Sequence, residues 1–432
     1  MKAWRPVAVS AAALFASMLA LGSAAAQPVG PPTPPPTPAF PGQTGAPAPR
    51  APSAEVAVQT VARGLSSPWA MAFLPDGRIL VSERRGEMRI VRPKDGVYSA
   101  PIAGVPGVKV TAGESLHDVV LDPQFKTNRL VYFTYFAPPP GQDPMVWPKE
   151  EFYDNEVAKP LAERRAHSIG AETLARGRLS EDGRRLEQVK VLLEGSNRRM
   201  LFTPDGKLLV LGTDRFRFYD SKMDGMSKLN ATLQERRQYA GRVSRINPDG
   251  SIPRDNPFVG VKGVDGDVWA FGVRDPDGIA IDPRSGKLWE VEHGPKGGDE
   301  LNLIKKGADY GWPLVSYGTQ YNGTPINGGA TQHDGTEQPV YYWFPDIGPS
   351  SALFYTGDVF PAWKNSLFVG ALAGRNLVRL VIENDRVVAE EQLLGDLKAR
   401  IRDVRQGPDG AIWLLTDEGD ILRLAPKAGG GS

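Results

Sequence analysis

The sequence predicts an all-β fold, a six-bladed β-propeller built from four-stranded antiparallel blades. One turn-forming tripeptide recurs along the chain, short apolar runs stand beside several copies of it, and sequence with helical character is scarce. Many short strands joined by the same hairpin turn are typical of folds that repeat one small sheet around an axis.

The recurring tripeptide is Pro-Asp-Gly. Proline presets the backbone of the first turn residue, aspartate favours the next position, and glycine accepts the left-handed conformation that closes a hairpin. Apolar runs precede and follow the copies that begin at Pro75, Pro204 and Pro408, and a variant of the same hairpin has its turn at 283–286. The five copies of the tripeptide lie at 75–77, 204–206, 248–250, 276–278 and 408–410.

The length of the folded region, residues 54–426, agrees with this repeat. Six blades of about 40–60 residues each fill it, and no internal linker divides it. A two-sheet sandwich is the structural alternative, but it does not need the same hairpin so many times. The best helical candidates, 161–166 and 226–239, fall in insertions between strand pairs. The proline-rich, charged insertion 137–170 is expected to form an irregular loop over one face.

The chain begins with the pattern of a secretory signal. Residues 1–6 are basic, residues 7–20 form an apolar stretch too short to span a bilayer, and three alanines at 24–26 supply a small-residue cleavage site. We therefore expect residues 1–26 to be removed and the mature protein to be exported, to the periplasm if the host is Gram-negative.

The segment after the signal, residues 27–53, is rich in proline and poor in apolar side chains. Such a composition predicts an extended, disordered tether, with a proline-rich ligand as the functional alternative. The last residues, 427–432, are expected to form a flexible tail.

Composition excludes several classes of function. Loss of the signal removes Lys2 and Arg5 and takes the formal net charge from +1 to −1, which gives no bulk attraction for nucleic acid or an anionic membrane. No later apolar run has the length of a membrane span. The chain has no cysteine, so disulfides and thiolate metal sites are excluded.

The stretch with the strongest chemical signal is 289–313, WEVEHGPKGGDELNLIKKGADYGWP. A β-like run ends at His293, glycines and a proline then expose main-chain carbonyls, and Asp299 and Glu300 follow. Hard cations such as Ca²⁺ bind clustered oxygens of this kind. The alternative is a polar loop with an N-capping aspartate.

This stretch closely resembles the signature loop of the soluble pyrroloquinoline quinone (PQQ) dependent aldose dehydrogenases, the glucose/sorbosone dehydrogenase family. The resemblance extends over most of the region from residue 65 to residue 424, as a divergent member, and six strings match in the family's order. They lie at 241–258, 271–278, 292–313, 335–339, 368–372 and 400–404.

The resemblance implies a six-bladed propeller with PQQ lying across one end of the central channel. Arg400 and Arg402 lie two residues apart, so on a strand both guanidiniums face one side and bind carboxylates bidentately. The alternative for Arg402 is an ion pair with the adjacent Asp403. The other cofactor-binding positions that match the family are Arg274, Tyr321, Ala371 and Leu372.

The resemblance also implies calcium. The carbonyls of Gly294 and Pro295 match those that face the Ca²⁺ that polarises PQQ in the family. Glu300 and Tyr310 match a second, structural calcium site.

One departure from the family concerns the catalytic base. In the family a histidine just before a Gly-Gly-Arg strand takes the hydroxyl proton of the sugar. Here the corresponding string, 194–202, reads EGSNRRMLF, with Arg199 in the place of the family arginine and no histidine nearby. The family's cofactor-contacting Gln-Gly-Gly is also changed, within 113–118.

The chain has four histidines that could replace the missing base. His117 is the candidate, although the start of a buried strand at 116–121 is the simpler interpretation of its position. His293 belongs to the metal loop, and His167 and His333 are expected to be exposed.

Two functional hypotheses follow. The first is an exported PQQ-dependent oxidoreductase that oxidises the C1 hydroxyl of an aldose or similar sugar and passes electrons to an unknown periplasmic acceptor. The alternative is a catalytically degenerate propeller of the same family that binds a ligand or partner. A lactonase-type hydrolytic propeller is disfavoured by the detailed match.

Overall fold

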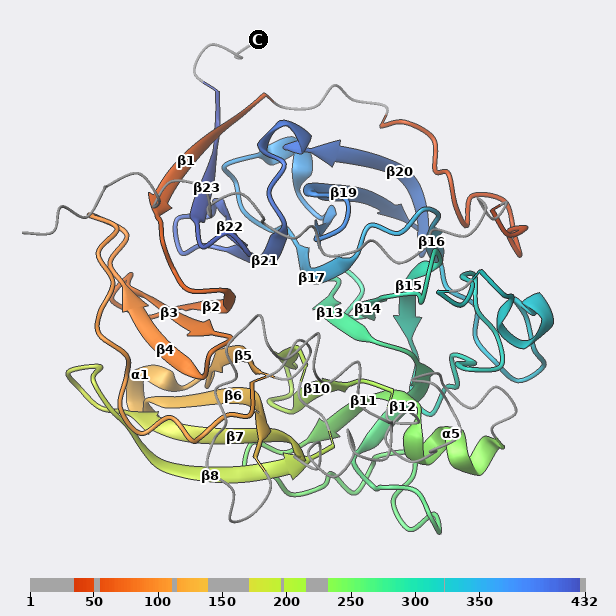
Figure 1. Cartoon of the computed structure of the whole chain (residues 1–432), viewed down its shortest axis with the longest axis horizontal. Coiled ribbons are helices and arrows are strands. Elements are labelled where there is room, and N and C mark those ends of the chain that lie inside the picture. The colour runs from red at the N-terminus through yellow and green to blue at the C-terminus, as the bar shows by residue number, and fades with distance from the viewer. Residues whose placement is uncertain are drawn as a thin grey trace, which may run out of the picture.

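The computed structural model describes residues 35–49, 55–110, 115–138, 171–195, 198–214, 232–321 and 323–427. Within these ranges the chain is almost entirely β, with twenty-three strands, two α-helices and three short 3₁₀-helices. Six antiparallel sheets stand in a ring around a common centre (Figure 1), which confirms the predicted six-bladed β-propeller.

Each blade is a meander that runs outward from the centre. The first contains β2 (Pro68–Phe73), β3 (Ile79–Glu83) and β4 (Glu87–Val91), and the second β5 (Leu116–Leu121), β6 (Leu130–Ala137), β7 (Ala171–Leu179) and β8 (Leu186–Glu194). The third contains β9 (Met200–Phe202), β10 (Leu208–Gly212), β11 (Gly241–Ile246) and β12 (Val268–Val273), and the fourth β13 (Pro276–Ile281), β14 (Leu288–Glu292), β15 (Asp299–Ile304) and β16 (Tyr341–Trp343). The fifth contains β17 (Pro349–Phe354), β18 (Leu367–Ala371), β19 (Asn376–Glu383) and β20 (Arg386–Leu393).

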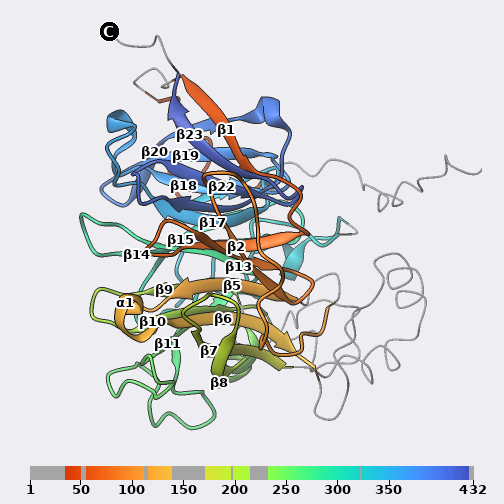
Figure 2. The same cartoon turned by 90° about the vertical axis from the view of Figure 1, so that its left-hand side faces the viewer.

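The sixth blade closes the ring with both ends of the chain. β21 (Ile401–Gln406), β22 (Ile412–Thr416) and β23 (Ile421–Pro426) are completed by β1 (Val56–Ala62). β1 and β23 pair antiparallel, from Val56 opposite Pro426 to Ala62 opposite Ile421, and lie side by side in both views (Figure 1, Figure 2). The ring therefore depends on backbone hydrogen bonds between segments that are far apart in sequence.

The first blade has three regular strands, and an irregular segment takes the fourth position. Residues 97–102 run beside β4, where the amide nitrogens of Arg92, Ser99 and Ile102 donate to the carbonyls of Val97, Ile90 and Met88 at 2.9, 2.9 and 2.8 Å. All six blades thus have the predicted four-stranded width.

The Pro-Asp-Gly turns behave as predicted in three blades. The glycines at 77, 206 and 410 have positive φ angles of 84°, 76° and 76° and lie in the hairpins that join β2 to β3, β9 to β10 and β21 to β22. The variant turn at 283–286 joins β13 to β14 in the same way, with Gly286 at φ 70°.

The copy of the tripeptide at 276–278 is not a turn but the start of β13. A bulge between Pro276 and Gly278 interrupts its pairing with β14. A Cβ on Gly278 would lie 2.5 Å from the Val291 side chain and 2.8 Å from the Ser351 backbone, so this glycine serves close packing between two blades.

The core consists of apolar layers between neighbouring blades. Trp69 and Leu80 of the first blade, for example, pack in one buried cluster with Leu116 and Phe133 of the second. Alternate residues of each strand face opposite sides of its sheet, so a blade buried on both faces has apolar residues at consecutive positions.

The helices are short. α5 (Leu233–Tyr239) begins at a capping box, in which Thr232 accepts from the Glu235 backbone and the Glu235 side chain accepts from the Thr232 backbone. It covers the second half of the candidate helix 226–239. α1 (Phe125–Asn128) and the 3₁₀-helices Ile326–Gly329, Pro361–Trp363 and Gly395–Leu397 are single turns in connections. Of the described residues, no helical segment is long and apolar enough to cross a membrane.

Residues 35–49, which we call the strap, differ from the tether expected for 27–53. The strap is packed against the fourth and fifth blades, beside β16 and β20 (Figure 1). Gln43 is fully buried, and the Phe40 ring lies 3.7 Å from the Arg386 guanidinium. Proline-rich chain loses little entropy on ordering, so a few anchoring side chains are enough to fix it. Residues 1–26, 161–166 and nearly all of 137–170 lie outside the described residues.

Candidate functional site

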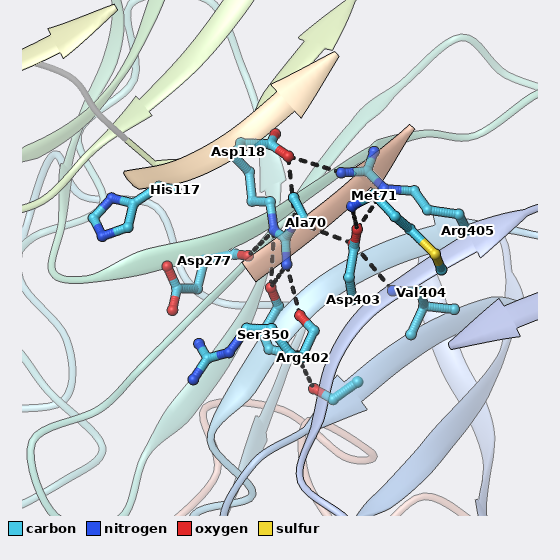
Figure 3. A network of polar contacts seen from close by, with 12 residues as sticks. Ala70, Met71, His117, Asp118, Asp277, Ser350, Arg402, Asp403, Val404 and Arg405 are labelled. Atoms are coloured by element: carbon cyan, nitrogen blue, oxygen red, sulfur yellow. Dashed lines mark hydrogen bonds and ion pairs between the residues drawn. The ribbon is translucent and has the colours of Figure 1, made fainter. Parts of the chain in front are cut away.

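One buried arginine connects all six blades at the centre of the ring. Arg199 precedes β9, and its side chain is only 3% exposed. It contacts the inner strand of every other blade through an ion pair, a carbonyl or an aromatic ring. These partners are the Trp69 ring at 4.0 Å, Asp118 at 3.3 Å, Asp403 at 3.1 Å, and the carbonyl oxygens of Asp277, Ser350 and Arg402 at 3.3, 2.9 and 2.6 Å. Figure 3 shows five of its partners, Asp118, Asp277, Ser350, Arg402 and Asp403, converging from different strands.

The two carboxylates that neutralise Arg199 are shared with Arg405. Arg405 lies 2.9 Å from Asp118 and 3.0 Å from Asp403. The same carboxylates also accept from the amides of Met200 and Met71 at 2.7 and 2.9 Å. Burial raises the pKa of Asp118, and the charges of Arg405 and Arg199 oppose that rise. The network forms a closed floor across the centre of the propeller.

Three side chains of predicted or potential function lie together on one side of this floor. Figure 3 shows His117, Asp277 and Arg402 pointing to the side opposite Arg405. Around them stand the residues that the family resemblance assigns to the cofactor. The candidate site is therefore the side of the floor on which His117, Asp277 and Arg402 lie, opposite Arg405.

Arg400 and Arg402 lie on the same face of the chain, as their spacing predicts. Both contact Asp417: Arg402 donates from Nε and Nη2 at 2.7 and 3.0 Å, and Arg400 donates from Nε at 2.8 Å. The expected alternative partner of Arg402, Asp403, faces Arg199 and Arg405 instead.

Two further residues of the predicted cofactor set lie next to this pair. Leu372 accepts a hydrogen bond from Arg400 Nη1 through its carbonyl oxygen at 3.0 Å. Ala371 ends β18 and is fully buried, as Leu372 nearly is.

Arg274 lies between the mouth of the site and the predicted metal-binding loop that begins at His293. Its Nη1 donates to the carbonyl oxygens of His293 and Gly294 at 2.9 and 3.1 Å, and its Nη2 donates to the Tyr321 hydroxyl at 3.5 Å. Tyr321 is 55% exposed, so its ring is open to a ligand. The structure thus brings Arg274, Tyr321 and Gly294 together, as predicted, with Pro295 next in the chain.

Sequence reasoning missed two arginines of the same site, Arg84 and Arg198. Burial lowers the pKa of Arg84, and the positive charges of Arg402 and Arg198 lower it further, against a partial offset by Asp417 and Asp277. These positive charges are partly balanced by Asp417, Asp277 and Asp275, which lies 3.2 Å from Arg198, and the charge that remains can attract an anion. Each stands in an Arg-Arg pair at a strand end, at 84–85 and 198–199, a signal that the sequence offered.

Asp277 is an acidic side chain of the site, as Asp417 and Asp275 are. Its Oδ1 lies 3.7 Å from Arg198 and its Oδ2 lies 3.6 Å from His293 Nε2. Asp277 is 4% exposed, and among the described residues Oδ1 has no hydrogen-bond donor. A buried carboxylate oxygen without a donor is available to accept a proton or a hydroxyl group.

His117 is buried but belongs to the same side of the floor. It lies on β5, is 1% exposed, and its ring centre is 5.0 Å from that of Trp69. His293 is fixed by a hydrogen bond rather than by a ring contact: its Nε2 lies 2.6 Å from the Pro349 carbonyl oxygen. His333 is exposed in its loop, as expected, and His167 lies outside the described residues.

The predicted partners Glu300 and Tyr310 do not meet through their side chains. The Tyr310 hydroxyl donates to the Leu303 carbonyl at 2.7 Å and accepts from the Lys305 amide at 2.9 Å. Only the main chain of Tyr310 is left to take part in a metal site with Glu300. A sequence match cannot distinguish a side-chain ligand from a carbonyl ligand.

Glu300 instead belongs to a buried group of oxygens. Asn302 Nδ2 lies 3.2, 3.3 and 3.5 Å from carboxylate oxygens of Glu290, Glu292 and Glu300 on β14 and β15. Burial raises the pKa of Glu292 to about 7 and that of Glu300 well above its usual range. These carboxylates are of the chemical class that Ca²⁺ prefers, but among the described residues no group of three or more His, Cys, Asp or Glu side chains is arranged to hold a metal ion.

The arginines fit PQQ. The quinone carries three carboxylates, and Arg84, Arg198, Arg274, Arg400 and Arg402 supply planar donors suited to carboxylates around one mouth. Trp312, 5.4 Å from the Arg274 guanidinium, adds an aromatic surface.

Comparison with known proteins agrees with this geometry. The family model described as Glucose / Sorbosone dehydrogenase matches residues 65–423. The chain is 34% identical to aldose sugar dehydrogenase YliI of Escherichia coli over 378 residues, which cover 87% of this chain and 94% of that protein.

Solved structures show the same similarity. A crystal structure of glucose dehydrogenase superposes with a TM-score of 0.73 at 37% identity, over 86% of this chain and 99% of that one. The PQQ-bound form of an aldose sugar dehydrogenase from Streptomyces coelicolor superposes with a TM-score of 0.63 at 25% identity, over 87% of this chain and 99% of that one. On this fold, site and similarity, the chain belongs to the glucose/sorbosone dehydrogenase family, which includes PQQ-dependent sugar dehydrogenases.

Proposed function

We propose that this chain is an exported PQQ-dependent oxidoreductase that oxidises the C1 hydroxyl of an aldose or a similar sugar, with calcium assisting the cofactor. The observation that carries the proposal is the crowding of five arginines at one mouth of the ring, above the floor made by Arg199. The positive charge of these arginine side chains is suited to a ligand that carries several carboxylates. Two of the five, Arg84 and Arg198, were not predicted from the family resemblance.

Each part of the site has a role in this reaction. Arg400 and Arg402 bind cofactor carboxylates from one side, and Arg274 holds the carbonyls of the metal loop from the other. Bound PQQ supplies the hydride acceptor. The closed Arg199 layer keeps water from reaching the site through the centre of the propeller.

Oxidation of a sugar hydroxyl also requires a proton acceptor. Asp277 is better placed than His117, because its Oδ1 has no donor among the described residues and faces the arginine-rich mouth. Arg198, 3.7 Å from Asp277, would stabilise negative charge that develops on the substrate oxygen. Asp277 thus replaces the family histidine in this proposal.

The proposal also includes export of the protein and an electron acceptor in the periplasm. Cleavage after Ala26 would release a mature chain that begins at Gln27, and a periplasmic electron acceptor would reoxidise the cofactor. N-terminal sequencing of the protein recovered from the periplasmic fraction tests the cleavage site.

A catalytically degenerate propeller is the second candidate. The replacement of the family's histidine string by EGSNRRMLF favours it, since no histidine stands where the base would be expected.

One experiment separates the two candidates. Purified mature protein is mixed with PQQ and Ca²⁺, PQQ binding is followed by absorbance, and dye reduction is followed with a panel of aldoses. Binding with sugar-dependent dye reduction supports the dehydrogenase. Binding without turnover supports the degenerate propeller, and no binding rejects the cofactor assignment.

A further inference from the structure

We propose that the strap positions the loop 294–298, and that Gln43 does so through Tyr317. The inference rests on the proposed function only for what this loop binds. How the loop is held depends on contacts within this chain.

Gln43 is the central anchor of the strap. It is fully buried, its Nε2 donates to the Pro339 carbonyl at 3.0 Å, and its Oε1 accepts from the Ala39 amide at 2.6 Å. Its own carbonyl accepts from the Tyr342 amide at 2.9 Å. A buried amide with its donors and acceptors paired specifies one position along the chain, because any shift leaves polar groups unpaired.

Contacts on both sides of Gln43 hold the rest of the strap. The Tyr342 hydroxyl donates to the Pro36 carbonyl at 2.8 Å, and the Ala46 amide donates to the Tyr341 hydroxyl at 3.4 Å. The Phe40 ring lies against Arg386 of β20. The strap therefore lines the outer strand β16 over ten residues or more.

Tyr317 carries this anchoring inward. Its ring stacks on Tyr342 with 4.1 Å between ring centres and an angle of 22°. Its hydroxyl donates to Gln338 Oε1 at 2.6 Å and also interacts with the Gln43 side chain. Burial raises the pKa of Tyr317, so the hydroxyl remains a proton donor at neutral pH.

The residues after Tyr317 form one wall of the loop 294–298. The Thr319 amide donates to the Lys296 carbonyl at 2.9 Å. A Cβ on Gly318 would lie 2.0 Å from the Gly297 carbonyl oxygen, and a Cβ on Gly298 would lie 2.4 Å from the carbonyl carbon of Tyr317. The two segments are in direct backbone contact, which only glycines permit.

The opposite wall comes from the end of β16, whose outer side the strap covers. The Gly298 amide donates to the Trp343 carbonyl at 2.9 Å, and a Cβ on Gly297 would lie 2.3 Å from the Phe344 ring. Gly297 and Gly298 have φ angles of 73° and 78°. Asp346 and Asp299 also accept from the Gly297 and Gly294 amides at 2.6 and 2.8 Å. Because glycine has little conformational preference of its own, the two walls and these carboxylates together set the position of the loop.

Hydrogen exchange in the metal-free mature protein tests the inference without any cofactor. Gln43→Ala is compared with Gln59→Ala, which removes an exposed glutamine from β1. Loss of the Gln43 contacts is expected to raise exchange at the Gly297 and Gly298 amides by about tenfold, while the amides of β21 and β22 keep their protection. Gln43→Met, which keeps volume but no polar group, should behave like Gln43→Ala.

The same variants are then titrated with PQQ and Ca²⁺. Gln43→Ala should weaken binding of PQQ and Ca²⁺ by about the factor by which exchange of the loop amides increases. Because Gln43 is proposed to act through Tyr317, the double variant with Tyr317→Phe should bind only slightly more weakly than Gln43→Ala alone. Should Gln43→Ala fail to fold, Phe40→Ala loosens the strap without leaving a buried polar group unpaired.

The outcomes are distinct. Loop exchange equal to that of Gln59→Ala overturns the inference. Faster exchange with unchanged PQQ and Ca²⁺ binding supports the strap as the element that positions the loop and shows that the loop does not bind either of them. Faster loop exchange in a protein whose wild type binds neither PQQ nor Ca²⁺ supports the strap as the element that positions the loop and rejects the proposed function.

Discussion

Arg199 and Asp403 form an ion pair of 3.1 Å across the centre of the propeller. Arg199 immediately precedes β9, and Asp403 lies on β21. Asp118 completes the charge balance from a third blade. Since these groups are buried, removing one leaves the others charged and unpaired, which is far more costly than the pair itself is stabilising.

Replacement of Arg199 should therefore destabilise the whole ring. Arg199→Met is expected to lower the free energy of unfolding by roughly 3–5 kcal/mol, and Arg199→Lys by less, because lysine keeps the charge but not the planar donors. Urea denaturation measures the change, with the exposed Arg85→Met as the control. A loss below about 1 kcal/mol would show that the layer is not essential to ring closure.

The Arg400 and Arg402 pair gives a test of the cofactor orientation. Arg402→Ala should weaken PQQ binding by on the order of a hundredfold, whereas Arg92→Ala, at an exposed surface ion pair, should have no effect. Asp417→Asn should strengthen binding, because Asp417 competes with the ligand for both guanidiniums. Weaker binding in Asp417→Asn would mean that Asp417 orients the arginines more than it competes.

Calcium should stabilise the native state. A ligand at a hundred times its Kd adds about 2.7 kcal/mol, so thermal midpoints should rise between EGTA and excess Ca²⁺. Glu300→Gln should reduce that rise, and Glu383→Gln at the exposed end of β19 should not. Identical midpoints with and without Ca²⁺ in the wild type would reject the metal site.

The proton acceptor is tested by two neutral substitutions. Asp277→Asn should lower sugar turnover by about 10²–10⁴ while PQQ titrations change little, because a general base acts on the reaction and not on cofactor affinity. His117→Gln should keep most of the rate. The same two substitutions at the consecutive exposed residues His333 and Asp334, His333→Gln and Asp334→Asn, serve as controls. The reverse order of effects would assign the base to His117.

Asp346 gives a prediction for pH. Burial raises its pKa to about 7 from the ordinary value of 3.8, and the charge of Asp299 adds to the rise. The native state thus retains a proton that the unfolded chain releases near pH 4, and stability from this group is lost as pH rises from about 4 to about 7. In urea titrations with EGTA, Asp346→Asn should lose stability less steeply than the wild type across that window, and the slope that remains comes from other buried carboxyls such as Glu292 and Glu300. An unchanged slope would show that Asp346 is ionised in the native protein.

Much of the architecture follows from residues that are adjacent in sequence. The Pro-Asp-Gly turns predicted three inner hairpins because the turn conformation is a property of three consecutive residues. The copy at 276–278 failed as a turn because packing of Gly278 against β17 outweighed the local preference. The packing of the strap against the propeller was not predicted, since nothing in a proline-rich string shows the surface on which Gln43 is buried.

The sequence by itself determined the fold class and the family, and it predicted a metal-binding loop and a cofactor-binding role for the arginine pair at 400 and 402. Only the tertiary structure showed that Arg199 contacts every blade, that Arg84 and Arg198 join the cofactor arginines, that Asp417 holds both Arg400 and Arg402, and that Tyr310 faces Leu303 rather than Glu300. Most of these relationships join residues tens to hundreds of positions apart. Closure of the ring brings such residues together, and no local pattern records which side chains then face one another.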